Sequence, residues 1–362
     1  AGTAIITMTE AGLWTDARYF LQAKHQLENT GVTLYRMGEE GVPTIMEYLR
    51  SALPEGGTLG FDGRVINARL GAAFLALAEK KNAKLAVGED LVGIIWDDRP
   101  ELPHAPVRIL TAEYSGRSTA DKLADVRAGM EKQGASVHLL TSLYDIAWLL
   151  NVRGGDIDYV PVVLSYLALT EEQCLWFVQD AVLTDELRAY LAENRIETRP
   201  YESFYDYAAA IPAGETVLLD KGVCNYRLVS ELCEGVEIVD ETNPSVLMKS
   251  IKNETEQKNT VNAHIKDGVA VTKFIYWLKK NIGKTPMTEL SASDYLAARR
   301  ALITDRALEP RAGDPHCGGT IYLCTADREG NMVSFIQSNY TTFGAGVAVP
   351  VRENSGFSLP GT

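Results

Sequence analysis

The stretch Val162–Val178, with the sequence VVLSYLALTEEQCLWFV, decides the fold of this chain. Residues 162–168 are apolar or small and predict a buried strand, Thr170–Gln173 predicts a turn, and Cys174–Val178 predicts a second strand. A helical pattern follows at residues 186–193. A strand hairpin followed by a helix indicates an α/β module.

The start of the chain shows the same order of elements. Residues 4–8 predict a strand, 9–12 a turn and 13–15 the beginning of a second strand, and helical spacing begins at Tyr19. In both places a Thr-Glu turn precedes a tryptophan by five or six residues. This similarity predicts two related modules, and coincidence between two ordinary hairpins is the alternative.

Further elements are predicted on both sides of the deciding stretch. Ser118, with Asp121 at the third helical position, predicts a capped helix that ends at Gly134, and residues 137–140 predict a short buried strand. Ser142 repeats the cap. Downstream, the elements expected are a helix starting at Asn243-Pro244, a long helix over 254–282, and a β-hairpin of 321–326 with 332–337.

Composition limits the possible partners. The net charge of −13 argues against nucleic acid, whose phosphates select basic surfaces. No apolar run approaches the roughly 18 to 20 residues of a membrane-spanning helix, so no membrane partner is expected. The five cysteines form no C-x-x-C pair, which favours free thiols and a cytoplasmic location.

Several segments resemble the Xaa-Pro aminopeptidase family, also called aminopeptidase P. They are Gly12–Gln22, Trp148–Asp156, Leu247–Glu256 and Ala263–Phe274, and the resemblance covers residues 1 to about 295. It implies an α/β fold of two creatinase-like N-terminal modules followed by a pita-bread metallopeptidase domain. It also implies an enzyme that releases the N-terminal residue preceding a proline in a peptide substrate.

The resemblance and the element pattern together predict four domains. These are a first creatinase-like module over 1–112, truncated at its N-terminus; a second module over 113–242; the start of a pita-bread domain over 243–295; and a hairpin segment over 296–362. The C-terminal part is expected to be an incomplete α+β segment.

The family's catalytic centre is a pair of divalent metal ions, usually manganese, held by two Asp, one His and two Glu. Hard oxygen ligands suit manganese. After residue 250 the only histidines are His264 and His316, and the nearby acidic residues lack the family's motifs. The expectation is therefore that this chain contains no metal site and no cofactor, and is an inactive fragment or chimera.

The tail resembles a second family, the γ-glutamyltransferases. The segments that carry this resemblance are Tyr295–Ile303, Gly318–Ser334 and Thr342–Gly346. It implies that a chain break before Thr320 would make this residue an N-terminal nucleophile, with Ser338 as a nearby hydroxyl. The alternative is an ordinary threonine before an uncleaved hairpin.

Arg153 is the substrate-binding candidate in the part of the chain that resembles the aminopeptidases. It lies in the sequence Asn-Val-Arg-Gly-Gly-Asp, which the resemblance places opposite the catalytic domain. A guanidinium could bind a peptide carboxylate or carbonyl there. Pairing with Asp156 or Asp158 is the alternative, and a non-catalytic dimerisation or docking scaffold, with a homodimer as one form of it, is the alternative for the chain as a whole.

Overall fold

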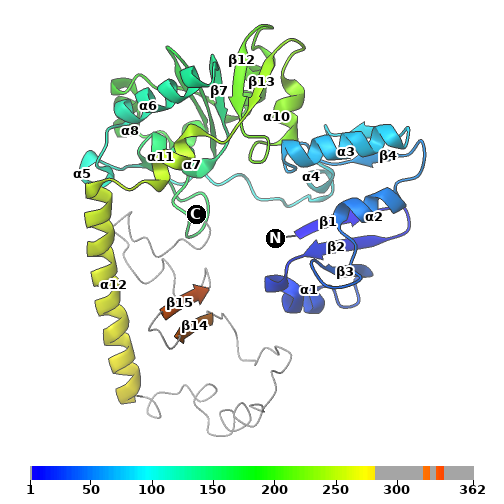
Figure 1. Ribbon diagram of the computed structural model, residues 1–362, viewed down its shortest axis with the longest axis horizontal. Helices are drawn as coiled ribbons and strands as arrows, with labels where there is room; N and C mark the ends of the chain where they lie inside the picture. The colour runs from blue at the N-terminus through cyan, green and yellow to red at the C-terminus, as the bar shows by residue number, and fades with distance from the viewer. Residues whose placement is uncertain (1, 282–320, 327–331, 338–362) are drawn as a thin grey trace.

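The second module is built on a six-stranded sheet. The computed structural model describes residues 2–281, 321–326 and 332–337 (Figure 1). The sheet order is β11-β10-β9-β7-β12-β13, with β9 antiparallel to both of its neighbours and the other pairs parallel. The strands are β7 Val137–Leu140, β9 Ser165–Thr170, β10 Cys174–Val178, β11 Glu197–Pro200, β12 Thr216–Leu219 and β13 Glu237–Asp240.

The predicted strand hairpin is confirmed, with one shift at its start. Strand β9 begins at Ser165 rather than at Val162. The reason is local, because the backbone N–H of Leu164 donates to the Asp156 carboxylate over 2.8 Å instead of to a neighbouring strand. Strands β7 and β10 have the predicted bounds.

Helices cover both faces of this sheet. On one face are α6 Thr119–Lys132, α7 Leu143–Leu149 and α8 Asp185–Glu193, and on the other are α9 Phe204–Ala209 and α10 Tyr226–Glu231. The predicted caps are present, since Ser118 and Ser142 accept from the N–H groups of Asp121 and Asp145. The aromatic cluster that begins α9 belongs to the core, with Phe204 fully buried.

The first module repeats the order of elements that the second module has from β9 onward, but in two separate sheets, β1-β2-β3 and β4-β5. Its elements are β1 Gly2–Ile6, β2 Ala11–Thr15, α1 Phe20–Gln26, β3 Val32–Arg36, α2 Ile45–Ala52, β4 Thr58–Gly60, α3 Ala68–Lys80, β5 Lys84–Ala86 and α4 Leu91–Ile95.

The relationship between the modules, predicted from the two Thr-Glu turns, is confirmed by strand pairing. Strand β1 is antiparallel to β2, which is parallel to β3; β9 is likewise antiparallel to β10, which is parallel to β11. The registers also correspond, because Trp14 faces Thr3 and Trp176 faces Leu167. Coincidence between two hairpins would not extend to the third strand.

The two modules also share a second sequence repeat. Residues 54–70 and 212–228 share the pattern P-x-G-x-T-x-x-x-D-x-x-V-x-N-x-R-L. In each copy the asparagine caps a helix, since Asn67 accepts from Leu70 N–H at the start of α3 and Asn225 from Leu228 N–H at the start of α10. The repeat therefore marks the strand-to-helix connection of each module.

These two connections bind each other in a nearly two-fold symmetric way. The N–H of Ala68 donates to the Cys224 carbonyl over 2.9 Å, and the equivalent N–H of Tyr226 donates to the Ile66 carbonyl over 2.8 Å. One residue further on, Arg69 N–H donates to Lys221 and Arg227 N–H to Gly63. A Cβ on Gly71 would lie 2.1 Å from the Tyr226 ring, so the close approach of α3 and α10 requires glycine there.

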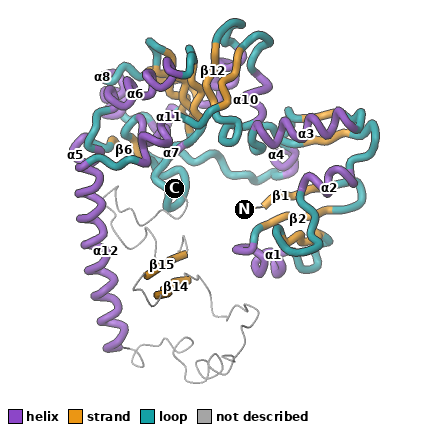
Figure 2. The backbone as a smooth tube through the Cα atoms, viewed as in Figure 1, coloured by secondary structure: helices purple, strands orange, loops and turns teal. Residues whose placement is uncertain are grey.

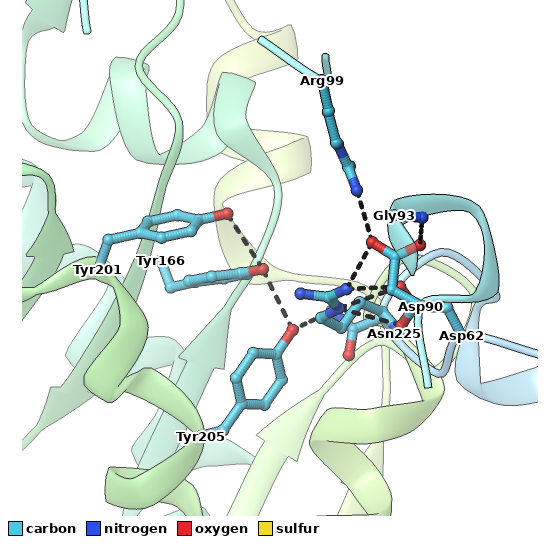
Figure 3. A network of polar contacts seen from close by, with 9 residues as sticks. Asp62, Asp90, Gly93, Arg99, Tyr166, Tyr201, Tyr205 and Asn225 are labelled. Atoms are coloured by element: carbon cyan, nitrogen blue, oxygen red, sulfur yellow. Dashed lines mark hydrogen bonds and ion pairs between the residues drawn. The ribbon is translucent and has the colours of Figure 1, made fainter. Parts of the chain in front are cut away.

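Side chains extend this interface (Figure 3). In the second module the hydroxyls of Tyr201, Tyr166 and Tyr205 form a chain, and the Asn225 amide donates to Tyr205 over 2.9 Å. The first module places Asp62 and Asp90 beside this chain, bridged by the guanidinium of Arg64 at 2.8 and 3.2 Å. The modules are thus joined by main-chain hydrogen bonds, by the contact of the Phe61 and Tyr226 rings, and by the ion pair of Arg69 with Asp240 at 3.5 Å.

The remaining described elements lie outside the sheets of the two modules. A long loop links α4 to β6 Arg108–Ile109, which pairs with β8 Val152–Arg153, and α5 Ala112–Ser115 follows (Figure 2). Helix α11 Pro244–Ser250 has its proline in the first turn, as predicted, and α12 Glu254–Asn281 extends away from both modules (Figure 1). The predicted hairpin is confirmed as β14 Ile321–Ala326 and β15 Met332–Gln337.

Candidate functional site

The turn that follows α7, residues 150–155, includes β8 and Arg153 and has a well-defined backbone geometry. Helix α7 ends at Leu149, and Asn151 then takes a left-handed conformation with φ of 52°, which asparagine tolerates better than most residues. Gly154 packs so closely that a Cβ there would lie 2.7 Å from the Val162 carbonyl oxygen. The turn is therefore a fixed structure that only certain residues can form.

A buried lysine holds this turn from behind. Lys122 of α6 is 1% exposed, and its ammonium donates to the Trp148 carbonyl over 2.9 Å and to Asn151 Oδ1 over 2.6 Å. It also lies 4.4 Å from the centre of the Trp148 ring. The carbonyl acceptors and the ring favour the charged form. Burial outweighs them and, with the nearby positive charge of Arg153, lowers the pKa of Lys122 to about 7.

Two further contacts fix the turn. The Asn151 amide donates to the Arg117 carbonyl over 2.9 Å, and the Tyr190 hydroxyl donates to the Leu150 carbonyl over 3.1 Å. At the other end the buried carboxylate of Asp156 accepts from the backbone N–H groups of Ala105 and Leu164, both at 2.8 Å. Asp156 thus joins the loop before β6 to the start of β9.

Arg153 is half-buried at the centre of this scaffold. Its Nη1 donates to the carbonyl oxygens of Ala147 and Val152, at 2.8 and 2.9 Å. These bonds orient the plane of the guanidinium. The expected role in substrate binding stays a prediction, and so does pairing with Asp158. Asp156 was the other expected partner of Arg153, and both of its carboxylate oxygens accept from backbone N–H groups.

Sequence reasoning missed the residues that hold Arg153 in place. Lys122, Asn151 and Tyr190 lie far apart in the sequence and meet only in the folded module. One signal was available, because an asparagine directly after a helix is a typical left-handed residue. A lysine in the fourth position after a helix cap gives no such signal.

The candidates in the tail lie outside the described residues. Thr320 comes directly before β14 and Ser338 directly after β15, and neither is among the residues the structure describes. His316 and the acidic residues 294, 305, 309, 314, 327 and 329 are outside them as well. His264 is exposed on α12, where its Nδ1 lies 2.8 Å from the Thr260 carbonyl oxygen, in agreement with a surface position.

Within the described ranges, no three or more His, Cys, Asp or Glu side chains are grouped so that they could hold a metal ion. In the same ranges no helix combines the length and the apolar character needed to cross a bilayer. The cysteines at 174, 224 and 233 are free thiols, as expected.

Sequence comparison relates most of the chain to aminopeptidases. The probable Xaa-Pro aminopeptidase P of Sordaria macrospora is 36% identical over 326 residues, which cover 84% of this chain and 52% of that protein. Aminopeptidase P2 of Arabidopsis thaliana is 33% identical over 335 residues, covering 83% and 47%. The chain spans about half the length of these curated relatives.

Two family profiles and one solved structure add to this. The profile of the Creatinase/Prolidase N-terminal domain matches residues 98–256, and the profile of Gamma-glutamyltranspeptidase matches residues 254–359, from the start of α12 onward. The crystal structure of the X-prolyl aminopeptidase of Caenorhabditis elegans superposes with a TM-score of 0.74 at 27% identity. It covers 89% of this chain and 52% of that one, and that protein is described as a cytosolic enzyme with a di-nuclear active site.

Proposed function

Because this chain is homologous to the Xaa-Pro aminopeptidases over 84% of its length, we propose that it serves in an enzyme that removes the N-terminal residue preceding a proline. The main observation in support is the superposition on the C. elegans enzyme, which extends over both modules rather than over a single domain. Peptide substrates follow from the same proposal.

We propose that the described modules form the peptide-side part of this enzyme. The half-buried guanidinium of Arg153 would bind a carboxylate or a carbonyl of the substrate peptide. Its plane is already oriented by the Ala147 and Val152 carbonyls, so little side-chain entropy would be lost on binding. The Lys122 scaffold would hold the turn at a fixed position against the peptide.

The metal pair that the family implies does not fit the described residues, because they hold no suitable group of ligands. We propose that the two manganese ions are held by a part of the enzyme that this chain does not supply. Because only two histidines follow residue 250, the further proposal is that this chain by itself does not turn over substrate.

Helix α12 has an exposed apolar surface that suits the packing of the proposed metal-binding part of the enzyme. Val261, Ile265 and Val269 are spaced by four residues, which places them along one side of the helix. They are 57%, 61% and 49% exposed, which is unusual for a row of apolar side chains. This row is where the metal-binding part of the enzyme is proposed to pack.

The proposal is tested by complementation. The 362-residue chain is mixed with the part of the C. elegans enzyme that it does not match, and release of arginine from Arg-Pro-Pro is measured with added manganese. The expected result is no turnover by either part alone and turnover by the mixture. Light scattering checks that the two parts associate. Association without proline-directed cleavage would contradict the proposed function, and turnover by the chain alone would contradict its incompleteness.

Arg153 is tested in the same mixture. Replacement by alanine is expected to raise KM for Arg-Pro-Pro by about tenfold or more, the usual effect of losing a hydrogen bond to a charged group. Arg153→Lys keeps the charge without the planar geometry and is expected to recover only part of the loss. An Arg153→Ala variant with unchanged KM would restrict this residue to a structural role.

We further propose a cytoplasmic location, which the free thiols and the description of the C. elegans relative as cytosolic support. Homodimer formation stays a prediction, and light scattering over a concentration series checks it.

A further inference from the structure

Lys122 is the most deeply buried of the described lysine, arginine, aspartate and glutamate side chains, with 1% of its surface exposed. A lysine in a helix ordinarily keeps its ammonium in water, because moving a charge out of water destabilises a fold unless buried partners compensate. The partners of this ammonium therefore show what the buried charge does.

The two partners of Lys122 are chain neighbours of the two groups that hold Arg153. The ammonium donates to the Trp148 carbonyl over 2.9 Å and to Asn151 Oδ1 over 2.6 Å. The carbonyl oxygens that accept from the Arg153 guanidinium belong to the residue directly before Trp148 and to the residue directly after Asn151. One ammonium thus fixes the chain beside both supports of the guanidinium.

Asn151 transmits this constraint to the backbone. Its Oδ1 accepts from Lys122 and its amide donates to the Arg117 carbonyl over 2.9 Å, so the side chain is held at both ends. Its left-handed conformation, with φ of 52°, turns the chain from α7 into β8. The direction of the Val152 carbonyl, and with it that of the Arg153 guanidinium, therefore depends on the hydrogen bond that Lys122 donates.

Several titratable groups act on the Lys122 ammonium. Burial lowers the pKa of Lys122 to about 7, and the positive charges of Arg153 and Arg117 lower it as well, whereas Glu256 at the start of α12 raises it. The Tyr190 hydroxyl of α8 stays neutral, because burial raises its pKa. Negative charge placed on Arg153 would offset its repulsion of the ammonium, and such a coupling acts equally in both directions.

We propose that Lys122 is the positioning residue of Arg153, holding both carbonyl supports of the guanidinium in place, and that a peptide oxygen bound to Arg153 in return strengthens the hold of the ammonium on the turn. The peptide part of this inference rests on the proposed function. The coupling between the two cations does not, and it can be measured without substrate.

The coupling fixes the direction of the pH dependence. A peptide carboxylate on Arg153 raises the pKa of Lys122 above its value of about 7 in the turn without peptide. Lys122 binds its proton in both states below pH 7, so its contribution to peptide affinity is complete there. The contribution is lost as the pH rises from about 7 through the pKa of the peptide-bound state.

The coupling is tested on the intact chain by nuclear magnetic resonance. The chain is labelled with ¹³C-lysine, the Cε resonance of Lys122 is identified by its loss in Lys122→Met, and its pKa is read from a pH titration. The expected pKa near 7 should rise in Arg153→Met, which removes the neighbouring charge. Lys132→Met, at an exposed position of the same helix, should leave the pKa of Lys122 unchanged.

Peptide binding is then read from the same resonance. Addition of Arg-Pro-Pro should raise the pKa of Lys122 in the wild-type chain and leave it unchanged in Arg153→Met, because that variant lacks the group that receives the carboxylate. This readout needs no turnover and no metal.

The positioning role is tested in the mixture with the part of the C. elegans enzyme that the chain does not match. Lys122→Met should raise KM for Arg-Pro-Pro about tenfold at pH 6 and leave kcat unchanged, since the ammonium supports binding rather than the chemical step. The ratio of the KM values of variant and wild type should fall toward one at pH 9. Titrations of the substrate and of the metals cancel in this ratio.

Lys122→Gln separates the charge from the hydrogen bond. The amide can still donate to one of the two acceptors, so this variant should show a smaller rise in KM than Lys122→Met. Urea denaturation checks that both variants fold.

The possible failures are distinguishable. No turnover by the mixture, together with a peptide-induced rise in the pKa of Lys122, would contradict the proposed function and support this inference. The inference is overturned if Arg153→Met or the peptide leaves the pKa of Lys122 unchanged, or if the KM ratio is the same at pH 6 and pH 9.

Discussion

The two modules share one order of elements and differ in how deeply their strands are buried. All four residues of β7 are buried, whereas β1 alternates between exposed and half-buried residues and has none that is fully buried. The equivalent alanines show the contrast, since Ala168 of β9 is 0% exposed and Ala4 of β1 is exposed. A single central strand therefore converts two half-sheets into one core with helices on both faces.

The largest expected effect comes from placing the same charge in both modules. Ala168→Asp would bury a carboxylate without a partner in the core cluster that contains Phe177 and Phe204, and should cost about 4 kcal/mol or more of the free energy of unfolding. Ala4→Asp should cost about 0.5 kcal/mol or less, because its side chain stays in water. Urea denaturation followed by tryptophan fluorescence measures both.

Equal costs at the two positions would break the comparison, since Ala4 would then be as buried in solution as Ala168. Ala4→Ser and Ala168→Ser serve as the uncharged controls. Ala168→Ser should lie between the two aspartate variants, as a buried hydroxyl is less costly than a buried carboxylate.

A second difference is the buried polar scaffold, which belongs to the second module. The ammonium of Lys122 has a pKa of about 7 in the folded chain, against an ordinary lysine value of 10.5. Between these values the unfolded chain binds a proton that the folded chain does not, so this group makes the folded state more stable as the pH rises from about 7 to about 10.5. The slope is at most about 1.4 kcal/mol per pH unit.

The Lys122→Met variant isolates this slope. The free energy of unfolding of the wild type minus that of the variant should increase between pH 7 and pH 10, measured by urea denaturation. Lys132→Met, at an exposed position of the same helix, should leave the pH dependence unchanged. A flat difference for Lys122→Met would mean that the lysine keeps its proton when the chain folds.

The sequence allowed much of the fold to be predicted because its signals are local. The strands at 137–140 and 174–178 and the caps at Ser118 and Ser142 depend on neighbouring residues, and all are present as expected. The start of β9 was wrong by three residues because the Asp156 carboxylate, eight residues earlier, takes the Leu164 N–H. A hydrogen bond from a side chain to the backbone leaves no periodic trace in the sequence.

The candidate site was predictable in part. Arg153 was identified from a resemblance, but its contacts with the Ala147 and Val152 carbonyls follow from how the chain folds back after α7. The support from Lys122 was not predictable, since a charged residue in a helix is ordinarily exposed. The repeat around Asn67 and Asn225 was visible in the sequence and would have located the module interface.

The smallest effects distinguish the two helix caps at that interface. Both asparagines accept from a backbone N–H in the first turn, over 2.8 Å for Asn67 and 3.0 Å for Asn225, and loss of such a cap costs about 1 kcal/mol. Asn225 also donates to the Tyr205 hydroxyl, so Asn225→Ala should cost about 1 kcal/mol more than Asn67→Ala. Serine at each position keeps the cap without the amide. Asn67→Ser should therefore be nearly neutral in urea denaturation, whereas Asn225→Ser should still lose the hydrogen bond to Tyr205. Equal losses of unfolding free energy for the two serine variants would mean that the two caps contribute equally, as their symmetric main-chain hydrogen bonds alone suggest.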